Sequence, residues 1–101
     1  MKPTLARGLD EASLQDLADL FQHLSDPRRL RLLLILSKGE HAVGELSAAL
    51  GVTISAVSHQ LQTLRQARLV ACRREGKRIL YHLDDVHVEQ LVRMGREHVE
   101  E

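Results

Sequence analysis

The stretch that decides the fold is VGELSAALGVTISAVSHQLQTLRQA, which occupies residues 43–67. Its first part predicts a short helix, because apolar residues recur at helical spacing at Val43, Leu46, Ala49 and Leu50. Gly51 predicts the end of this helix, since glycine adopts the left-handed backbone conformation without a penalty from a Cβ atom. Thr53 then stands in an N-cap position, so a second helix is expected to begin directly after it.

The second helix is predicted to have two faces of different chemistry. The face expected to be buried carries Ile54, Val57, Leu61 and Leu64. The opposite face carries short, uncharged polar side chains that can approach base edges in the major groove of DNA, as the second helix of a helix-turn-helix does. The residues predicted to contact DNA are Thr53, Ser55, Ser58, His59 and Gln62. The alternative is a surface helix pair in an all-α domain.

A basic hairpin is predicted directly after this helix pair. Residues 69–72 and 79–83 are typical of two short strands, and Gly76 is available for the turn between them. Its tip carries four basic residues opposed only by Glu75: Arg73, Arg74, Lys77 and Arg78. A basic hairpin in this place is a wing, and its charges suit contacts with phosphate beside the groove. The alternative is an edge hairpin that its charges protect from aggregation.

Composition sets bounds on the class of protein. The chain has 101 residues, 44% of them hydrophobic, so we expect one domain over residues 1–101 with a modest core and a loose arm at residues 1–9. The single cysteine, Cys72, excludes an internal disulfide framework and fits a reducing compartment. The longest apolar run is too short to span a bilayer, and the sequence lacks a signal peptide, so a cytoplasmic location is expected.

Charge is distributed unevenly along the chain. The formal net charge is zero, but residues 65–78 are strongly basic and lie between acidic segments at residues 10–26 and 84–101. Opposite poles on a small domain are compatible with one side that faces DNA.

The first and last predicted helices are candidates for a dimer interface. A helix at residues 13–24 has a continuous apolar stripe that either the domain or a second subunit must cover. The last helix, at residues 84–101 with Asp84 or Asp85 as its cap, has a second stripe. Gly95 in its middle is tolerated where another helix approaches closely. We therefore expect a mainly α chain with a β-hairpin, a winged helix-turn-helix that forms a homodimer through its first and last helices.

The last helix also carries histidines and carboxylates at spacings that predict a metal site. His87 and His98 are eleven residues apart, so they face the same way but lie about 16 Å apart along the axis, too far to share one ion. If two copies of the helix pack antiparallel across a two-fold axis, His87 of one meets His98 of the other and two identical sites result. Asp85 can converge with His87 at an irregular helix start, and Glu101 shares a face with His98. Two imidazoles and two carboxylates suit Zn²⁺, with Co²⁺ as a mimic.

A solvated acidic helix with two ordinary histidines is the alternative to this metal site. The fourth ligand is also open, because Glu100 or the terminal α-carboxylate could take the place of Glu101.

The chain resembles the ArsR/SmtB family of metal-sensing transcriptional repressors over about residues 14–101. The segments that carry the resemblance are LSDPRRLRLLLIL, VGELSAALGVTISAVSHQLQTLRQARLV and RREGKRILYHL. The final helix, with D-x-H followed by H-x-x-E, is similar to zinc-sensing members whose site lies between the C-terminal helices. The resemblance implies that the metal-free dimer binds its operator, that metal lowers DNA affinity, and that the ligands are Asp85, His87, His98 and Glu101. It also places the backbone acceptor of the His98 ring N–H near Arg68.

One departure from the family pattern narrows the metal. Many relatives have a cysteine in an ELCVGDL-like segment, where this chain has EHAVGEL with Ala42 in that position. Sensing of As(III), Cd²⁺ or Pb²⁺ through cysteines there is not expected. The rival hypotheses are a winged-helix regulator that senses Ni²⁺, Co²⁺ or no metal, and a winged helix that binds protein instead of DNA. An enzyme is not expected, because no nucleophile with a base partner and no phosphate loop is evident.

Overall fold

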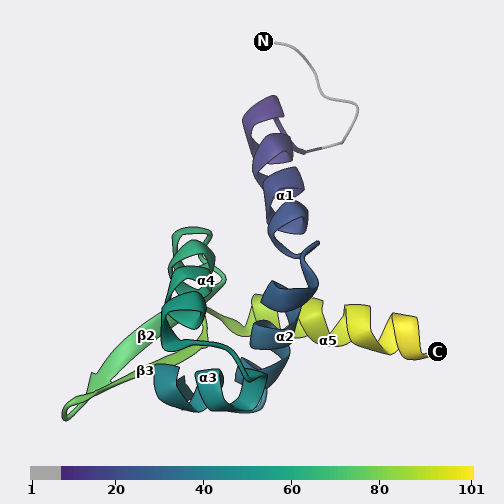
Figure 1. Cartoon of the computed structure of the whole chain (residues 1–101). Helices are drawn as coiled ribbons and strands as arrows, with labels where there is room; N and C mark the ends of the chain where they lie inside the picture. Colours follow the sequence, from purple (N-terminus) through teal and green to yellow (C-terminus); the bar gives the residue numbers. More distant parts are fainter. Residues whose placement is uncertain (1–7) are drawn as a thin grey trace.

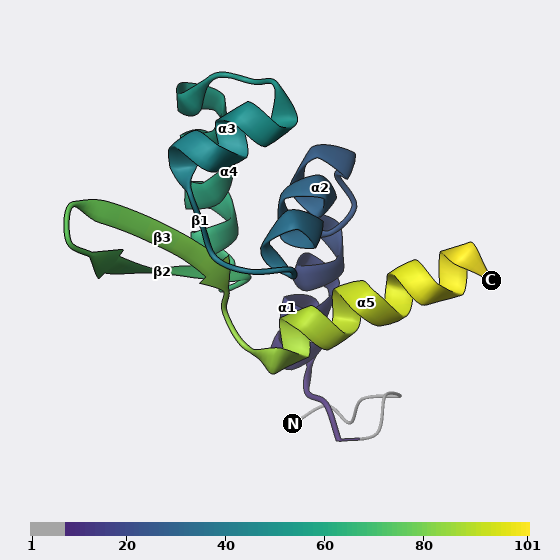
Figure 2. The ribbon, with the colours of Figure 1, turned by 90° about the horizontal axis from the view of Figure 1, so that it is seen from below.

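The computed structural model describes residues 8–101, so most of the predicted arm at residues 1–9 lies outside the described part (Figure 1). Along the chain the elements are α1 (Glu11–His23), α2 (Pro27–Leu36), β1 (His41–Ala42), α3 (Val43–Leu50), α4 (Ile54–Gln66), β2 (Val70–Glu75), β3 (Arg78–Leu83) and α5 (Val86–Glu100). The β2–β3 hairpin and α5 extend from the body in opposite directions (Figures 1 and 2).

Local capping chemistry produces the predicted helix-turn-helix. Gly51 ends α3 with φ 67°, and its backbone N–H donates to the carbonyl of Ser47 over 2.9 Å. The hydroxyl of Thr53 accepts a hydrogen bond from the backbone N–H of Ala56 at 3.1 Å, which makes Thr53 the N-cap of α4. Both predicted helix boundaries are therefore confirmed.

One residue of the predicted buried stripe was placed wrongly. Val57, Leu61 and Leu64 are buried, but the side chain of Ile54 is 57% exposed. Ile54 is the first residue of α4, where the stripe runs past the edge of the core, so helical spacing alone does not bury it.

The sheet has three strands instead of the predicted two. Its order is β1-β3-β2, and all pairs are antiparallel. The two-residue strand β1 pairs with β3 only at Tyr81 and Leu80, so Ile79 lies beyond its end. Leu80 is buried and Ile79 is 40% exposed, the reverse of the alternation that the sequence indicated for these two residues.

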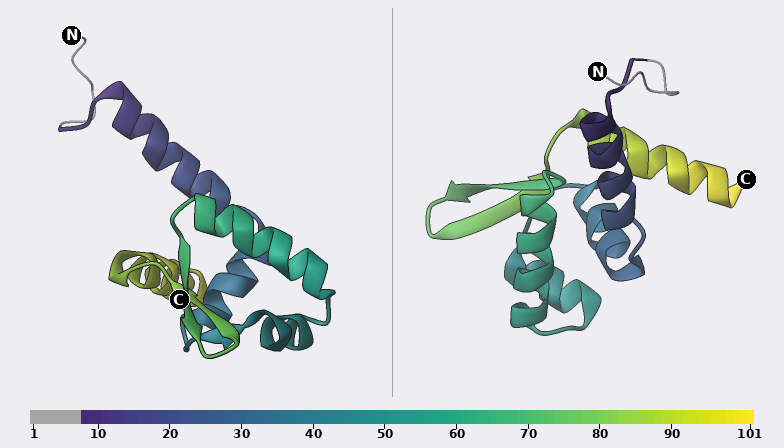
Figure 3. Two further views of the ribbon diagram at one scale, coloured as in Figure 1. Left: turned by 90° about the vertical axis from the view of Figure 1, so that its left-hand side faces the viewer. Right: turned by 90° about the horizontal axis from the view of Figure 1, so that it is seen from above.

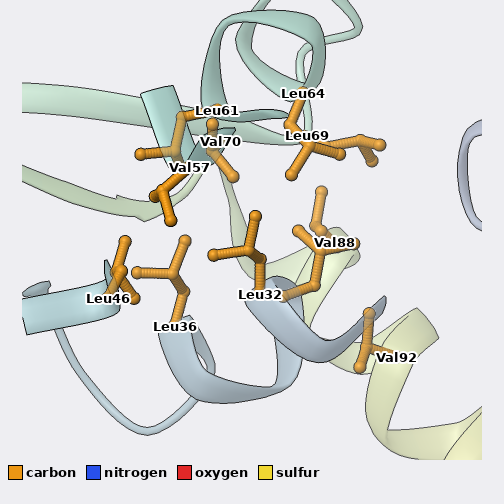
Figure 4. Packing of buried hydrophobic residues seen from close by; sticks show 11 residues of the cluster. Leu32, Leu36, Leu46, Val57, Leu61, Leu64, Leu69, Val70, Val88 and Val92 are labelled. Atoms are coloured by element: carbon orange, nitrogen blue, oxygen red, sulfur yellow. The ribbon is translucent and has the colours of Figure 1, made fainter. Parts of the chain in front are cut away.

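Aliphatic side chains from helices and sheet build the core (Figure 4). Every residue of the buried cluster is leucine or valine: Leu32, Leu33, Leu36, Leu46, Val57, Leu61, Leu64, Leu69, Val70, Val88 and Val92. These residues come from α2, α3, α4, β2 with the residue before it, and α5. The core therefore holds the helix-turn-helix, the base of the wing and the first half of α5 in one body.

The helix α1 contributes no buried residue to this core. It begins at Glu11, two residues before the predicted start, because Asp10 caps it by accepting a hydrogen bond from the backbone N–H of Ser13 at 2.7 Å. Its N-terminal part projects from the body (Figures 1 and 3), while Leu20 near its C-terminal end packs against the core. Leu17 and Phe21 on its apolar stripe are 41% and 52% exposed. Over residues 8–101, the helices are all too short or too polar to cross a membrane.

Candidate functional site

The outer face of α4 is polar and open to solvent. Ser55, Ser58, His59 and Gln62 are all exposed, on the side of the helix away from its buried residues. The side chains of these four form no ion pair in the described structure. Thr53 is exposed as well, but its hydroxyl is engaged in capping α4. This face has the chemistry that base-edge recognition requires.

Two of the four basic residues of the wing are paired with carboxylates, which the sequence did not indicate. The guanidinium of Arg73 donates to both carboxylate oxygens of Glu40 at 2.7–3.0 Å and to Glu75 at 3.0 Å. Arg78 pairs with Glu45 at 3.1 Å. Sequence reasoning missed Glu40 and Glu45, because no local pattern links residues that lie 33 positions apart.

The other two basic residues of the wing keep their charge available. Arg74 donates from Nε to the carbonyl of Gly76 at 3.1 Å, which leaves its positive charge without a carboxylate partner in the described residues. Lys77 is exposed at the turn, and no ion pair engages it over residues 8–101. The free positive charge of the wing therefore concentrates at its tip.

Asp85 and His87 converge at the start of α5. Asp85 is the N-cap, and its Oδ1 accepts hydrogen bonds from the backbone N–H groups of His87 at 2.9 Å and Val88 at 3.1 Å. Its Oδ2 lies 3.6 Å from Nδ1 of His87. The hydrogen bond from the Val88 backbone lowers the pKa of the Asp85 carboxyl, so this group is ionised at neutral pH. The cap prediction for Asp85 is confirmed, and the pair presents one carboxylate and one imidazole to solvent.

His98 and Glu101 lie at the other end of the same helix. Both are exposed, and Glu101 follows the last residue of α5. Glu100 is held at 3.4 Å by Arg96, whereas Glu101 forms no ion pair in the described structure, which favours Glu101 as the available donor. Over residues 8–101 of one protomer, no three His, Cys, Asp or Glu side chains come together as a metal site. A single chain thus offers two separated pairs of donors.

An apolar groove of about 870 Å³ lies between α1, α2 and α5. The residues that line it are mainly apolar, with His98 and two charged residues among them: Phe21, Leu24, Leu30, Leu34, Leu91, Val92, Met94, Gly95, Arg96, His98, Val99 and Glu100. A Cβ at Gly95 would meet nothing within 4 Å in one protomer, so the chain itself gives no steric reason for a glycine there.

The turn after α4 has an unusual backbone. Arg68 has φ 61°, in the left-handed region that non-glycine residues seldom adopt, and its N–H donates to the carbonyl of Arg65 at 3.0 Å. The C-terminal end of α5 points away from α4 and the sheet (Figures 1 and 2), so one protomer forms no hydrogen bond between His98 and this turn. The link between them stays a prediction.

Comparison with known proteins identifies the family of this chain. Residues 26–71 match the model of the bacterial regulatory proteins of the arsR family. The transcriptional repressor SmtB homolog of Synechocystis is 47% identical over 93 residues, which cover 92% of this chain and 69% of that protein. The chain belongs to the ArsR family. Its α3–α4 pair and β2–β3 hairpin are therefore the helix-turn-helix and wing of a DNA-binding transcriptional repressor, and the expectation that it is not an enzyme is confirmed.

Solved structures of ArsR-type regulators confirm the fold class. The homodimeric winged helix-turn-helix domain of Mb0332 from Mycobacterium bovis is 31% identical, with a TM-score of 0.85, and covers 99% of this chain and 91% of that one. The antimony-specific transcriptional repressor AntR is 34% identical, with a TM-score of 0.80, and covers 99% and 93%. The family match ends at residue 71, before α5, so the predicted metal ligands of this ArsR-family chain remain a hypothesis.

Proposed function

We propose that this ArsR-family chain is a zinc-responsive repressor. Its metal-free homodimer binds operator DNA, and Zn²⁺ bound between the two α5 helices lowers DNA affinity and derepresses genes for metal efflux or sequestration. The observation that carries the proposal is the division of donors on α5, with Asp85 and His87 together at its start and His98 and Glu101 at its end. A regulator that responds to Ni²⁺, Co²⁺ or no metal is the second candidate.

The apolar faces of α1 and α5 support the homodimer. Phe21 on α1 is 52% exposed, and Met94 and Val99 on α5 are 64% and 82% exposed. All three line the groove between these helices, and an apolar groove of this size is unfavourable in water. A second copy that inserts its own α1 and α5 would cover it, and the M. bovis relative is described as homodimeric. Two-fold symmetry would then bring the start of one α5 to the end of the other.

The donor chemistry supports a borderline metal ion such as Zn²⁺. The residues that would hold it are Asp85 and His87 of one protomer with His98 and Glu101 of the other, an N₂O₂ set that suits Zn²⁺. Thiolate chemistry lacks support, because Cys72 is the single cysteine of the chain and is partly buried in β2. Bound metal would supply a crosslink between protomers, while the Asp85 cap keeps its carboxylate fixed against His87.

We expect the purified protein to bind one Co²⁺ per protomer with the intense visible absorption of four-coordinate cobalt. His87→Ala and His98→Ala should each abolish that absorption, because each removes one of two imidazoles from both sites. His59→Ala is the matched control, since His59 is an exposed histidine on α4, and it should leave the titration unchanged. If the His87→Ala protein bound Co²⁺ with the same absorption as the wild type, the ligand assignment would be wrong. A weak six-coordinate spectrum in the wild type would favour the Ni²⁺ or Co²⁺ sensor.

We expect base recognition and phosphate binding to separate in mutants. Ser58→Ala on α4 should relax sequence preference, because it removes a polar group from the face proposed to meet base edges. Lys77→Ala should weaken binding to all duplexes alike and reduce the slope of log affinity against log salt by about one. The measurement is a salt series on operator and scrambled DNA. Altered sequence preference in Lys77→Ala with an intact slope would contradict this division.

A further inference from the structure

The wing is tied to the rest of the domain by an arginine fork. Arg73, on β2, uses Nε and Nη2 to hold both oxygens of Glu40, the residue directly before β1. The same Nη2 also reaches Glu75 at 3.0 Å. A bidentate guanidinium–carboxylate pair fixes relative orientation as well as distance, unlike a single-point contact. The pair joins β2 to the residue before β1, although these segments are far apart in sequence and β2 does not pair with β1 in the sheet.

A second pair ties the other strand of the wing. Arg78, at the start of β3, lies 3.1 Å from Oε2 of Glu45 in the first turn of α3. The other oxygen of Glu45 accepts the backbone N–H of Ala42 at 2.7 Å and so caps the helix. The carboxylate is therefore held in place by α3 when it meets Arg78. Each strand of the hairpin thus has one arginine paired with a carboxylate from residues 40–45.

We propose that Glu40 and Glu45 clamp the wing, and that Arg73 and Arg78 are positioning residues that aim the hairpin instead of binding phosphate. The clamp sets the angle of the wing to the helix-turn-helix, because β1 runs directly into α3. Phosphate contacts then fall on Arg74 and Lys77 at the tip. This inference rests on the proposed contact between wing and phosphate, and it narrows the four basic residues predicted from the sequence to two.

The charges around the fork explain why it persists. The hydrogen bonds from Arg73 hold the pKa of the Glu40 carboxyl below its usual range, so Glu40 stays ionised at neutral pH. To reach phosphate, Arg73 would have to leave two carboxylates, and both would then lie unpaired beside the DNA backbone. Lys77 meets no such opposition in the described residues. Arg74 and Lys77 therefore provide the phosphate contacts, and Arg73 and Arg78, which are held by carboxylates, provide the alignment.

Two charge-conserving substitutions test the clamp. Glu40→Asp shortens the carboxylate, and Arg73→Lys removes the fork while it keeps a positive charge that can still bind phosphate. We expect each to weaken operator binding about three- to tenfold with an unchanged salt slope. The double mutant should be no weaker than either single mutant, because both remove one interaction. Arg78→Lys should also weaken operator binding with an unchanged salt slope, because it alters the pair with Glu45 and keeps the positive charge.

A shortened duplex separates alignment of the wing from general damage to the fold. On DNA cut back to remove the phosphates beside the half-sites, wild-type binding should be weaker than on the full duplex. On this short duplex the clamp variants should bind almost as tightly as the wild type, because the aligned wing no longer has phosphates to contact. Thermal unfolding shows whether each variant is folded. Lys77→Ala tests the contact between wing and phosphate independently, because it should reduce the slope of log affinity against log salt by about one. The clamp is refuted if Glu40→Asp raises operator affinity and the salt slope by freeing Arg73 for phosphate, or if Arg73→Lys binds the operator like wild type. It is also refuted if the variants lose as much affinity relative to wild type on the short duplex as on the full one.

Discussion

Zn²⁺ is expected to weaken operator binding by the wild-type protein about ten- to a hundredfold, the usual range for coupling between two sites. His87→Ala should bind the operator like wild type without metal and show no response, because both proposed sites lose an imidazole. His98→Asn should keep some affinity for Zn²⁺, because the amide oxygen of Asn can act as a weak fourth donor, but it should lose the regulatory response. The measurement is operator binding by all three proteins with Zn²⁺ and with a chelator.

The physical reason for this coupling is the geometry of a two-fold dimer on DNA. Recognition helices must sit about one turn of DNA apart to enter successive major grooves. The first half of α5 belongs to the same core as α4, through Val88 and Val92. A crosslink between two α5 helices would therefore fix the angle between protomers and with it the spacing of the two α4 helices. A dimer held at the wrong spacing engages only one half-site.

His98 has a distinct part in this expectation. A metal-bound imidazole usually donates its second N–H to a nearby acceptor. We expect that acceptor to be the backbone near Arg68, at the end of α4, once the dimer has formed. His59→Ala should keep the zinc response, although it affects DNA binding itself. If Zn²⁺ weakens operator binding equally in the wild type, His87→Ala and His98→Asn, neither α5 histidine carries the response.

Phe21→Glu is expected to convert the dimer to a monomer and to lower operator affinity at least a hundredfold. The substitution places a carboxylate in the mainly apolar groove between α1 and α5, where a second copy would strip it of water. A monomer loses the second half-site, and linking two binding events raises the overall affinity by about 10²–10⁴. Sedimentation at micromolar concentration and operator binding are the two measurements.

The matched control is Gln22→Glu, which adds the same charge to α1 at the adjacent exposed residue that does not line the groove. It should remain dimeric and bind the operator normally. Circular dichroism of Phe21→Glu should retain the helical signal, because α1 contributes no buried residue to the core. A Phe21→Glu protein that sediments as a dimer and keeps its operator affinity would contradict the proposed interface.

The sequence by itself determined the features that depend on near neighbours in the chain. Gly51 and Thr53 predicted the turn between α3 and α4, because left-handed backbone and N-capping are decided by one or two residues. In the same way, the sequence placed the cap of α5 at Asp84 or Asp85, and the structure selects Asp85, which lies beside His87. Helical spacing likewise placed Val57, Leu61 and Leu64 in the core.

Tertiary structure alone decided the features that depend on distant segments. The strand β1 exists because β3 pairs with it, and two residues are too few to show an alternation in sequence. The structure also buries Leu80 in place of Ile79, which depends on what packs against each face of β3. Ile54, the first residue of α4, is exposed although Val57 one turn later is buried, so the edge of the core falls between them. Glu40 meets Arg73 across 33 residues only when the sheet closes, so the charge of the wing was visible in the sequence, but the carboxylates that hold it were not.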